Sequence, residues 1–127
     1  MQLRSFMSAK IHKATVTEAD LNYVGSITID AELLEHTGLL PNEKVLVVSN
    51  STGARLETYI IEGKRGSGYI GVNGAASHLI GAGEEIIIIA FTLASEPVAP
   101  KAILVDKNNK FVRHLTEKQG EYTPSTA

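Results

Sequence analysis

A glycine–serine pair, Gly25 and Ser26, stands between two strand-like runs of the sequence. Glycine has no Cβ, so its carbonyl carbon is open to attack and an unusual φ costs little. The hydroxyl of a following serine can attack that carbonyl if the fold strains the bond and supplies donors to the developing oxyanion. Gly-Ser pairs are common and usually form turns. The pair therefore indicates a self-cleaving peptide bond only if the surrounding residues support that chemistry.

The chain has no cysteine, which excludes thiolate nucleophiles, disulfides and cysteine-based metal sites. It also has no Walker, GxGxxG or HExxH motif, and His36, His78 and His114 lack ligand-like spacing, so we expect no metal. The remaining side chains that could do chemistry are those of Lys10, His12, Tyr23, Ser26, Arg55, Thr58 and Tyr59.

Each of these candidates also has an ordinary structural interpretation. Lys10 and His12 are two apart in a strand-like run, so they share a face that could simply be solvated. Arg55 follows a glycine turn and could be a surface residue. Tyr59 could be half-buried packing whose hydroxyl finds a local partner.

Composition limits the class of protein. The chain has 127 residues, 43% of them hydrophobic, which fits one small domain over residues 1–127. A net charge of −2 argues against a nucleic-acid binder. Residues 1–6 are too polar for a secretory signal, and the apolar run 86–91 is too short to span a membrane. We therefore expect a cytoplasmic protein that binds neither nucleic acid nor a membrane.

Short strands dominate the expected secondary structure. Asp30 is a good N-cap for one helix, and Gly38 suits the position after its end. The expected elements are one or two strands over 2–16, a turn or short helix over 17–22, strand 27–29, helix Ala31–Thr37, strands Val45–Ser49, Arg55–Glu62 and Tyr69–Val72, one or two helical turns over 73–80, strand Glu85–Leu93, and a hairpin of Ile103–Val105 and Phe111–Val112.

These elements predict a small closed β-barrel, because closure removes the exposed strand edges. The strand Glu85–Leu93 has little polar alternation, which predicts burial on both faces. Pro97 and Pro100 mark the expected end of the compact region, and residues 119–127 are expected to form a flexible tail.

Ordered blocks along nearly the whole chain resemble the pyruvoyl-dependent aspartate 1-decarboxylase family, although the part beyond Pro97 matches less strongly. The resemblance implies a mainly β fold, a closed barrel of the double-psi type with short helices, and a homotetramer with active sites between neighbouring subunits. The blocks are Lys10–His12, Ala19–Asp30, Gly53–Tyr59, Arg65–Ser67, Val72–Ala76 and Gly81–Ala90.

The resemblance also implies a self-generated cofactor. Ser26 would attack the Gly25 carbonyl, the ester formed would eliminate, and hydrolysis would leave a covalently bound pyruvoyl group derived from Ser26. The products would be a small chain, 1–25, and a larger chain, 26–127. That group would form a Schiff base with L-aspartate and release CO₂ and β-alanine, a precursor of pantothenate and coenzyme A.

By the same resemblance, the residues have separate roles. Thr58 donates to the oxyanion at the Gly25 carbonyl during processing and also contacts substrate, and loss of such a donor costs about 3 kcal/mol of transition-state stabilisation. Tyr59 is the catalytic proton donor. Arg55 binds a substrate carboxylate through its planar fork. The other residues expected to bind substrate or line its pocket are Lys10, His12, Asn73, Gly74, Ala75 and Ala76.

Two alternatives come from other classes. A non-enzymatic β-barrel regulator or binding module would share the short strands and the segment Thr37–Val45. Such a function does not explain the residues around Gly25 and Ser26. The second alternative is an enzyme that uses Lys10 as its imine-forming amine. With labelled aspartate and borohydride, such an enzyme would carry the label on Lys10 rather than at residue 26.

Overall fold

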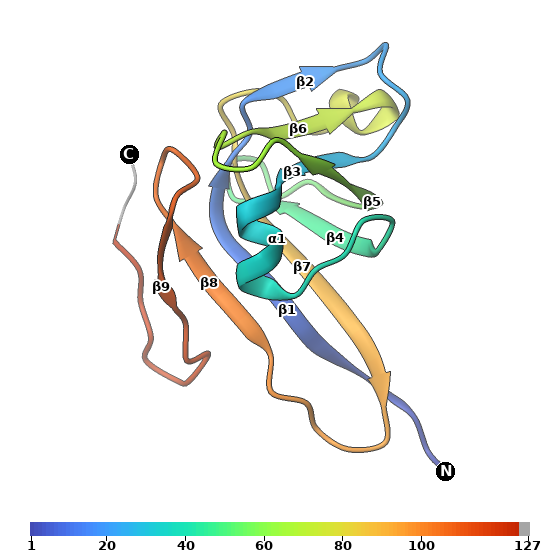
Figure 1. Ribbon diagram of the computed structural model, residues 1–127, viewed down its shortest axis with the longest axis vertical. Helices are drawn as coiled ribbons and strands as arrows, with labels where there is room; N and C mark the ends of the chain where they lie inside the picture. Colours follow the sequence, from blue (N-terminus) through green and yellow to red (C-terminus); the bar gives the residue numbers. More distant parts are fainter. Residues whose placement is uncertain (125–127) are drawn as a thin grey trace.

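A computed structural model describes residues 1–124 of the chain, and short strands make up most of it (Figure 1). The long strands β1 and β7 run side by side, and their far ends extend away from the rest of the molecule together with the N-terminus. The elements in order are β1 (Arg4–Thr15), β2 (Glu18–Asp20), β3 (Ile27–Asp30), α1 (Ala31–Thr37), β4 (Lys44–Ser49), β5 (Arg55–Gly63), β6 (Ile70–Asn73), the 3₁₀ helix η1 (Gly74–His78), β7 (Glu85–Ala94), β8 (Lys101–Val105) and β9 (Phe111–His114).

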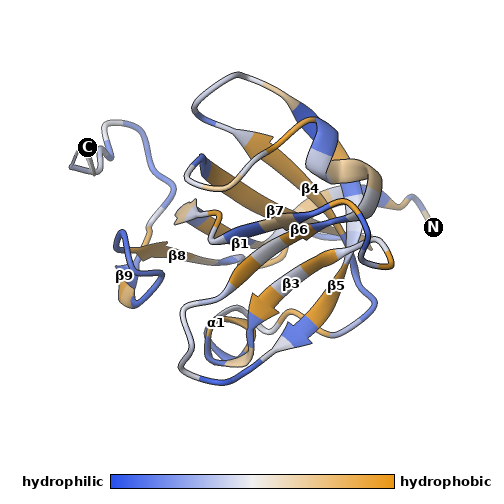
Figure 2. Cartoon of the chain, turned by 90° about the horizontal axis from the view of Figure 1, so that it is seen from above, coloured by the Kyte–Doolittle hydropathy of each residue, from blue (hydrophilic) through white to orange (hydrophobic). Residues whose placement is uncertain are grey.

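The strands follow the order β2-β6-β3-β5-β4-β7-β1-β8-β9. The backbone N–H of Thr17, just after β1, donates to the carbonyl of Ile70 in β6 at 2.9 Å, so the sheet curls back on itself. Branched aliphatic side chains fill the interior, and Figure 2 shows hydrophobic colour along β3, β4 and β7. This is the small, mainly β barrel of the double-psi type that the sequence predicts.

The expected helix is confirmed at both ends. Asp30 accepts the backbone N–H of Glu32, and Gly38 follows the helix with φ of 74°, a left-handed conformation that glycine adopts without strain. Asp30 is only 1% exposed, and its carboxylate also accepts the backbone N–H groups of Gly66 and Gly68. One side chain therefore ties the end of β3, the start of α1 and the turn before β6 together.

Three expectations about the strands are wrong. Residues 18–20 are neither turn nor helix but a strand, β2, because they pair in parallel with Gly71–Asn73 of β6. β7 is not buried on both faces: its first half alternates, and Phe91 and Leu93 are 48% and 68% exposed where the strand leaves the barrel. Pro97 and Pro100 do not end the compact region, because β8 pairs with β1 and buries Ile103 in the core.

The remaining strands and the β8–β9 hairpin lie close to their expected positions, with Val105 opposite Phe111. The expected irregularity in the first strand is also present. The pairing of β1 with β7 shifts register between Ile11 and Ala14, and Lys13 between them has φ of 65°. Such an irregularity bends and twists a strand, which suits the rim of a barrel.

Replacing Asp30 by Asn is expected to lower the free energy of unfolding by about 2–3 kcal/mol, because one of the three backbone N–H groups that bond to this carboxylate would then face an amide NH₂. Burial raises the pKa of Asp30, but the bonds from Gly68, Glu32 and Gly66 outweigh it, and the net pKa lies below the ordinary 3.8. The carboxylate therefore stabilises the fold above that value, and the stabilisation is lost as pH falls through the folded-state pKa.

Denaturant unfolding of the wild type and Asp30→Asn at pH 7, and of both as the pH is lowered, measures this contribution. Asp106→Asn is the matched control, because Asp106 accepts two backbone N–H groups in an exposed turn. Equal unfolding midpoints for the wild type and Asp30→Asn at pH 7 would contradict the role given to Asp30.

Candidate active site

The backbone at Gly25 and Ser26 takes a conformation that L-residues avoid. Gly25 has φ of 53° and Ser26 has φ of 84°, and the Ser26 side chain is only 2% exposed. A non-glycine residue held there costs on the order of 1–3 kcal/mol unless its surroundings hold it in place. The N–H of Gly25 also donates to the carbonyl of Tyr23 at 2.8 Å, which forms a tight three-residue turn.

Asn73, the last residue of β6, holds Ser26 in two ways. Its backbone N–H donates to the Ser26 carbonyl at 3.0 Å, and its side-chain Nδ2 donates to Ser26 Oγ at 3.3 Å. The same Nδ2 donates to Thr28 Oγ1 at 3.0 Å. The hydroxyl of Ser26 is therefore buried, and the Asn73 amide holds its direction.

Gly74 presses against the same turn from the other side. A Cβ at this position would lie 2.9 Å from both Cα and N of Gly25, and Gly74 itself has φ of 64°. Only glycine fits both the conformation and the close approach. The start of η1 thus packs directly on the Gly25 backbone.

A pocket of about 420 Å³ opens beside this turn. The hydroxyl of Tyr59, from β5, reaches towards it and lies 3.5 Å from the carbonyl of Val24. The lining residues are Gly25, Ser26, Leu56, Glu57, Thr58, Tyr59, Asn73, Ala75, Ala76 and Leu79.

Most of the residues predicted around Ser26 therefore meet there. Leu56, Glu57 and Leu79 were not predicted as lining residues, although the first two directly precede Thr58. Thr28 was not predicted either, although its two-residue spacing from Ser26 could have indicated it.

Arg55 does not line this pocket. It is exposed at the start of β5, and strand alternation puts its side chain on the same face as that of Tyr59, roughly 13 Å along the strand.

Lys10 and His12 lie elsewhere, on β1, where residues 115–124 cover them. We call residues 115–124 the C-terminal strap. Glu117 of the strap forms an ion pair with Lys10 at 2.9 Å, and both side chains are largely shielded from solvent. Thr123 lies 3.4 Å from Nε2 of His12, and Lys13 Nζ donates to the carbonyl of Pro124 at 2.8 Å.

His12 is uncharged at neutral pH in these surroundings. Burial lowers its pKa below the ordinary 6.5, and the positive charges of Lys10 and Lys13 lower it further. Within residues 1–124 its Nδ1 is buried without a hydrogen-bond partner. The imidazole thus has a polar ring atom that no described group satisfies.

Glu121 anchors the strap. It accepts the backbone N–H groups of Thr116 and Glu117 and pairs with Arg113, and these bonds, with Thr116 the largest cause, lower its pKa to about 2. A flexible tail over 119–127 stays a prediction, of which residues 125–127 lie outside the described part of the chain.

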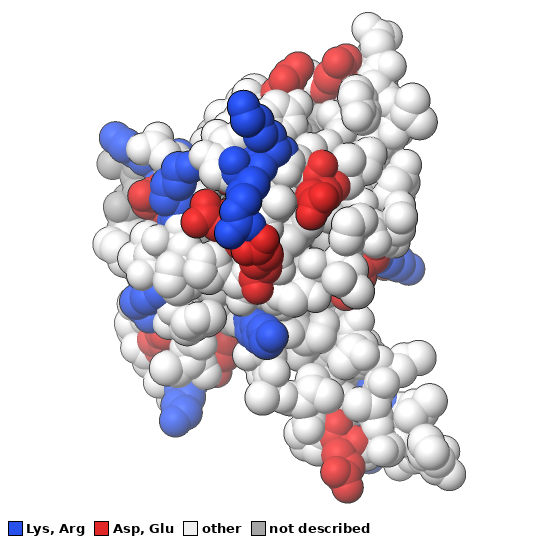
Figure 3. Space-filling model, in the orientation of Figure 1, with Lys and Arg blue, Asp and Glu red and all other residues white. Residues whose placement is uncertain are grey.

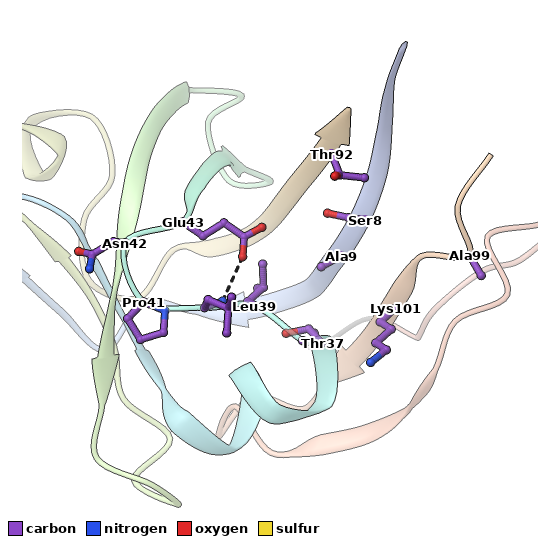
Figure 4. Close-up of a pocket in the computed structure, with 12 residues that line it drawn as sticks. Ser8, Ala9, Thr37, Leu39, Pro41, Asn42, Glu43, Thr92, Ala99 and Lys101 are labelled. Carbon is purple, nitrogen blue, oxygen red and sulfur yellow. Dashed lines mark hydrogen bonds between the residues drawn. The ribbon is translucent and has the colours of Figure 1, made fainter. Parts of the chain in front are cut away.

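A second pocket, of about 580 Å³, lies between α1, the loop after it and strands β1 and β8 (Figure 4). None of the residues predicted to do chemistry lines it. Its charged lining residues are Glu43 and Lys101, and the Glu43 carboxylate already accepts the backbone N–H of Leu40 at 3.0 Å. The smaller pocket beside Ser26 is therefore the candidate active site.

Comparison with known proteins identifies the family of the chain. The family model described as aspartate decarboxylase matches residues 1–112. The chain belongs to the aspartate decarboxylase family. It is 57% identical to the aspartate 1-decarboxylase of Carboxydothermus hydrogenoformans, over 91% of this chain and 93% of the relative. It is also 54% identical to that of Bacillus subtilis (88% and 91%) and 55% identical to that of Neisseria meningitidis (94% and 97%).

The family expected from the sequence is thus confirmed, and with it an enzyme of the carboxy-lyase class whose relatives are named for aspartate. Figure 3 shows that the Lys and Arg side chains on the face in view, including a group near its upper centre, have Asp and Glu side chains beside them. In the described part of the chain, no helix is long and apolar enough to cross a membrane.

Proposed function

We propose that this chain decarboxylates L-aspartate to β-alanine with a pyruvoyl group made from Ser26, after cleavage of its own Gly25–Ser26 bond into chains 1–25 and 26–127. The observation that carries the proposal is the buried Ser26, whose φ of 84° follows that of 53° at Gly25, beside a pocket lined by Thr58, Tyr59 and Asn73. Family membership supports the substrate. The geometry supports Ser26 as the origin of the cofactor.

The cleavage balances with water as the one co-reactant. Ser26 Oγ attacks the Gly25 carbonyl carbon, the C–N bond to Ser26 breaks, and the nitrogen takes the hydroxyl proton, which leaves an ester. Loss of the Ser26 Cα proton then breaks the Cβ–Oγ bond and frees the carboxylate of Gly25. The dehydroalanine that remains takes up water and releases ammonia, which leaves a keto group at residue 26.

The backbone conformation and two neighbouring residues favour the first of these steps. The left-handed backbone raises the ground-state energy of the bond that breaks. Asn73 Nδ2 orients Ser26 Oγ at 3.3 Å. Thr58 lines the same pocket, and its hydroxyl is the proposed donor to the oxyanion that develops on the Gly25 carbonyl.

In the mature enzyme the pyruvoyl group supplies the carbonyl that condenses with the substrate amine and the electron sink for loss of CO₂. The protein's side chains bind, orient and protonate. Arg55 holds a substrate carboxylate through its planar fork at the mouth of the pocket. Tyr59, whose phenol faces the Gly25–Ser26 turn, donates the proton to the α-carbon. Asn73, Ala75 and Ala76 line the pocket around residue 26, and Gly74 packs on the Gly25 backbone behind it.

A neighbouring copy of the chain completes the site in this proposal. Lys10 and His12 do not line the pocket of their own chain, and the apolar side chains of Phe91 and Leu93 are exposed on the β1–β7 ribbon. A homotetramer with sites between subunits can cover that ribbon and bring a Lys10–His12 pair to a neighbouring pocket, where Lys10 adds positive charge and His12 a hydrogen bond for the second carboxylate. We assign the enzyme to the cytoplasm.

Ser26→Ala tests the proposal, because alanine lacks the oxygen that attacks Gly25. Intact-mass spectrometry should show one full-length chain for Ser26→Ala. For the wild type it should show two fragments, the larger lighter by one ammonia than residues 26–127 with an N-terminal serine. CO₂ release from aspartate should occur with the wild type and be absent with the variant.

Ser67→Ala provides a control, because Ser67 lies in an exposed turn and its hydroxyl bonds only to local backbone there. It should be cut and active like the wild type. Decarboxylation by uncut Ser26→Ala, or a wild type that stays in one piece after prolonged warming and releases no CO₂, would falsify the proposal.

Glu117→Gln should lower the KM for aspartate severalfold with little change in kcat. In the structure the Lys10 ammonium already forms an ion pair with the Glu117 carboxylate. A substrate carboxylate that binds Lys10 therefore has to displace Glu117. A neutral amide competes less well for a cation than a carboxylate does. Steady-state kinetics on fully cleaved protein measures the effect.

Two further variants make the result specific. Glu121→Gln weakens the anchor of the strap and should shift KM in the same direction. Glu35→Gln removes an ion-paired carboxylate from α1, where it pairs with Arg65, and should leave KM unchanged. An unchanged KM in Glu117→Gln would remove Lys10 from the substrate-binding residues.

A further inference from the structure

Thr28 lies on the same side of β3 as the site but outside the pocket that surrounds Ser26. In the antiparallel pairing of β3 with β6, Ile27 is opposite Val72 and Thr28 is opposite Gly71, so Ser26 comes opposite Asn73. Thr28 and Asn73 are therefore diagonal neighbours on one face of the pair. Gly71 contributes no side chain between them, and Asn73 Nδ2 donates to Thr28 Oγ1 at 3.0 Å.

Packing fixes the direction of the Thr28 hydroxyl. A Cβ built on Gly63, in the neighbouring strand β5, would lie 3.0 Å from Thr28 Cγ2, so the methyl group sits directly over that glycine. A β-branched side chain has little freedom at χ1. With the methyl against β5, the hydroxyl is directed to β6, where Asn73 ends the strand.

The amide of Asn73 is thereby held at two points. An Asn NH₂ has two hydrogens, and here one faces Thr28 Oγ1 and the other faces Ser26 Oγ at 3.3 Å. Without the Thr28 acceptor, the amide could rotate or flip and would lose its fixed direction towards Ser26. A donor on Oγ favours the deprotonated form of the hydroxyl, which is the form that attacks.

We propose that Thr28 is a positioning residue for self-cleavage: its hydroxyl fixes the Asn73 amide so that Nδ2 points at the attacking oxygen of Ser26. The inference rests on the proposed function, because it concerns the same Gly25–Ser26 bond. Thr28 touches neither the scissile carbonyl nor the substrate pocket. Its effect passes through Asn73.

The test follows cleavage of freshly purified precursor by intact-mass spectrometry over time. Thr28→Val keeps the shape but removes the hydroxyl, and it should slow cleavage about five- to tenfold, the effect of losing one neutral hydrogen bond at a transition state. Thr28→Ser keeps the hydroxyl and should stay within about twofold of the wild type. Thr28→Ala, a second hydroxyl-free variant, should be slow like Thr28→Val.

Thr37→Val is the matched control, because it deletes a buried hydroxyl that bonds only to backbone carbonyls within α1. It should cleave at the wild-type rate. Cleavage of Thr28→Val at the wild-type rate would overturn the assignment, and so would equal slowing of Thr28→Val and Thr28→Ser, or slowing by Thr37→Val as large as that by Thr28→Val. A wild type that never cuts would instead defeat the proposed function, and the role of Thr28 with it.

Discussion

The site depends on two consecutive residues, Gly25 and Ser26, that both have positive φ. A hydrogen bond from the backbone N–H of Asn73 to the Ser26 carbonyl holds them in this conformation. Without that bond and the close packing of Gly74, Ser26 would relax to an ordinary extended or helical conformation, which is lower in energy by a few kcal/mol. The surrounding strands thus store strain at one peptide bond. Asn73 also donates to the Ser26 hydroxyl and fixes its direction. The strained backbone and the oriented hydroxyl therefore depend on the same residue.

The barrel can hold this strained turn because the strands that contact the turn are themselves fixed in the sheet. β3 lies between β6 and β5, so residues from both neighbours, Asn73 and Thr58, reach the start of β3. The buried carboxylate of Asp30 ties the other end of β3 to the turn before β6. The C-terminal strap is held differently, by polar and charged contacts at the surface. A substrate carboxylate could therefore displace it at less cost than it could move any part of the barrel.

Local patterns in the sequence predicted what local physics determines. Asp30 and Gly38 located helix α1, and the hairpin of β8 and β9 followed from its turn. The residues around Ser26 were predicted through ordered blocks of resemblance, and the pocket brings most of them together. β2 was missed because its short polar sequence becomes a strand only by pairing with β6. The contact of the C-terminal strap with His12 was not predicted, because it joins residues 111 positions apart and no local sequence pattern indicates such a contact. The exposure of Phe91 follows from how far the ribbon projects, which composition does not encode.

We propose that the electrophile of this enzyme is its own residue 26. The most direct measurement is reductive trapping: the wild type is incubated with isotope-labelled aspartate and borohydride, and the labelled peptide is located by mass spectrometry. We expect label at the N-terminus of the 26–127 chain, and none in Ser26→Ala. Label on Lys10, or on any residue of an uncut chain, would contradict it.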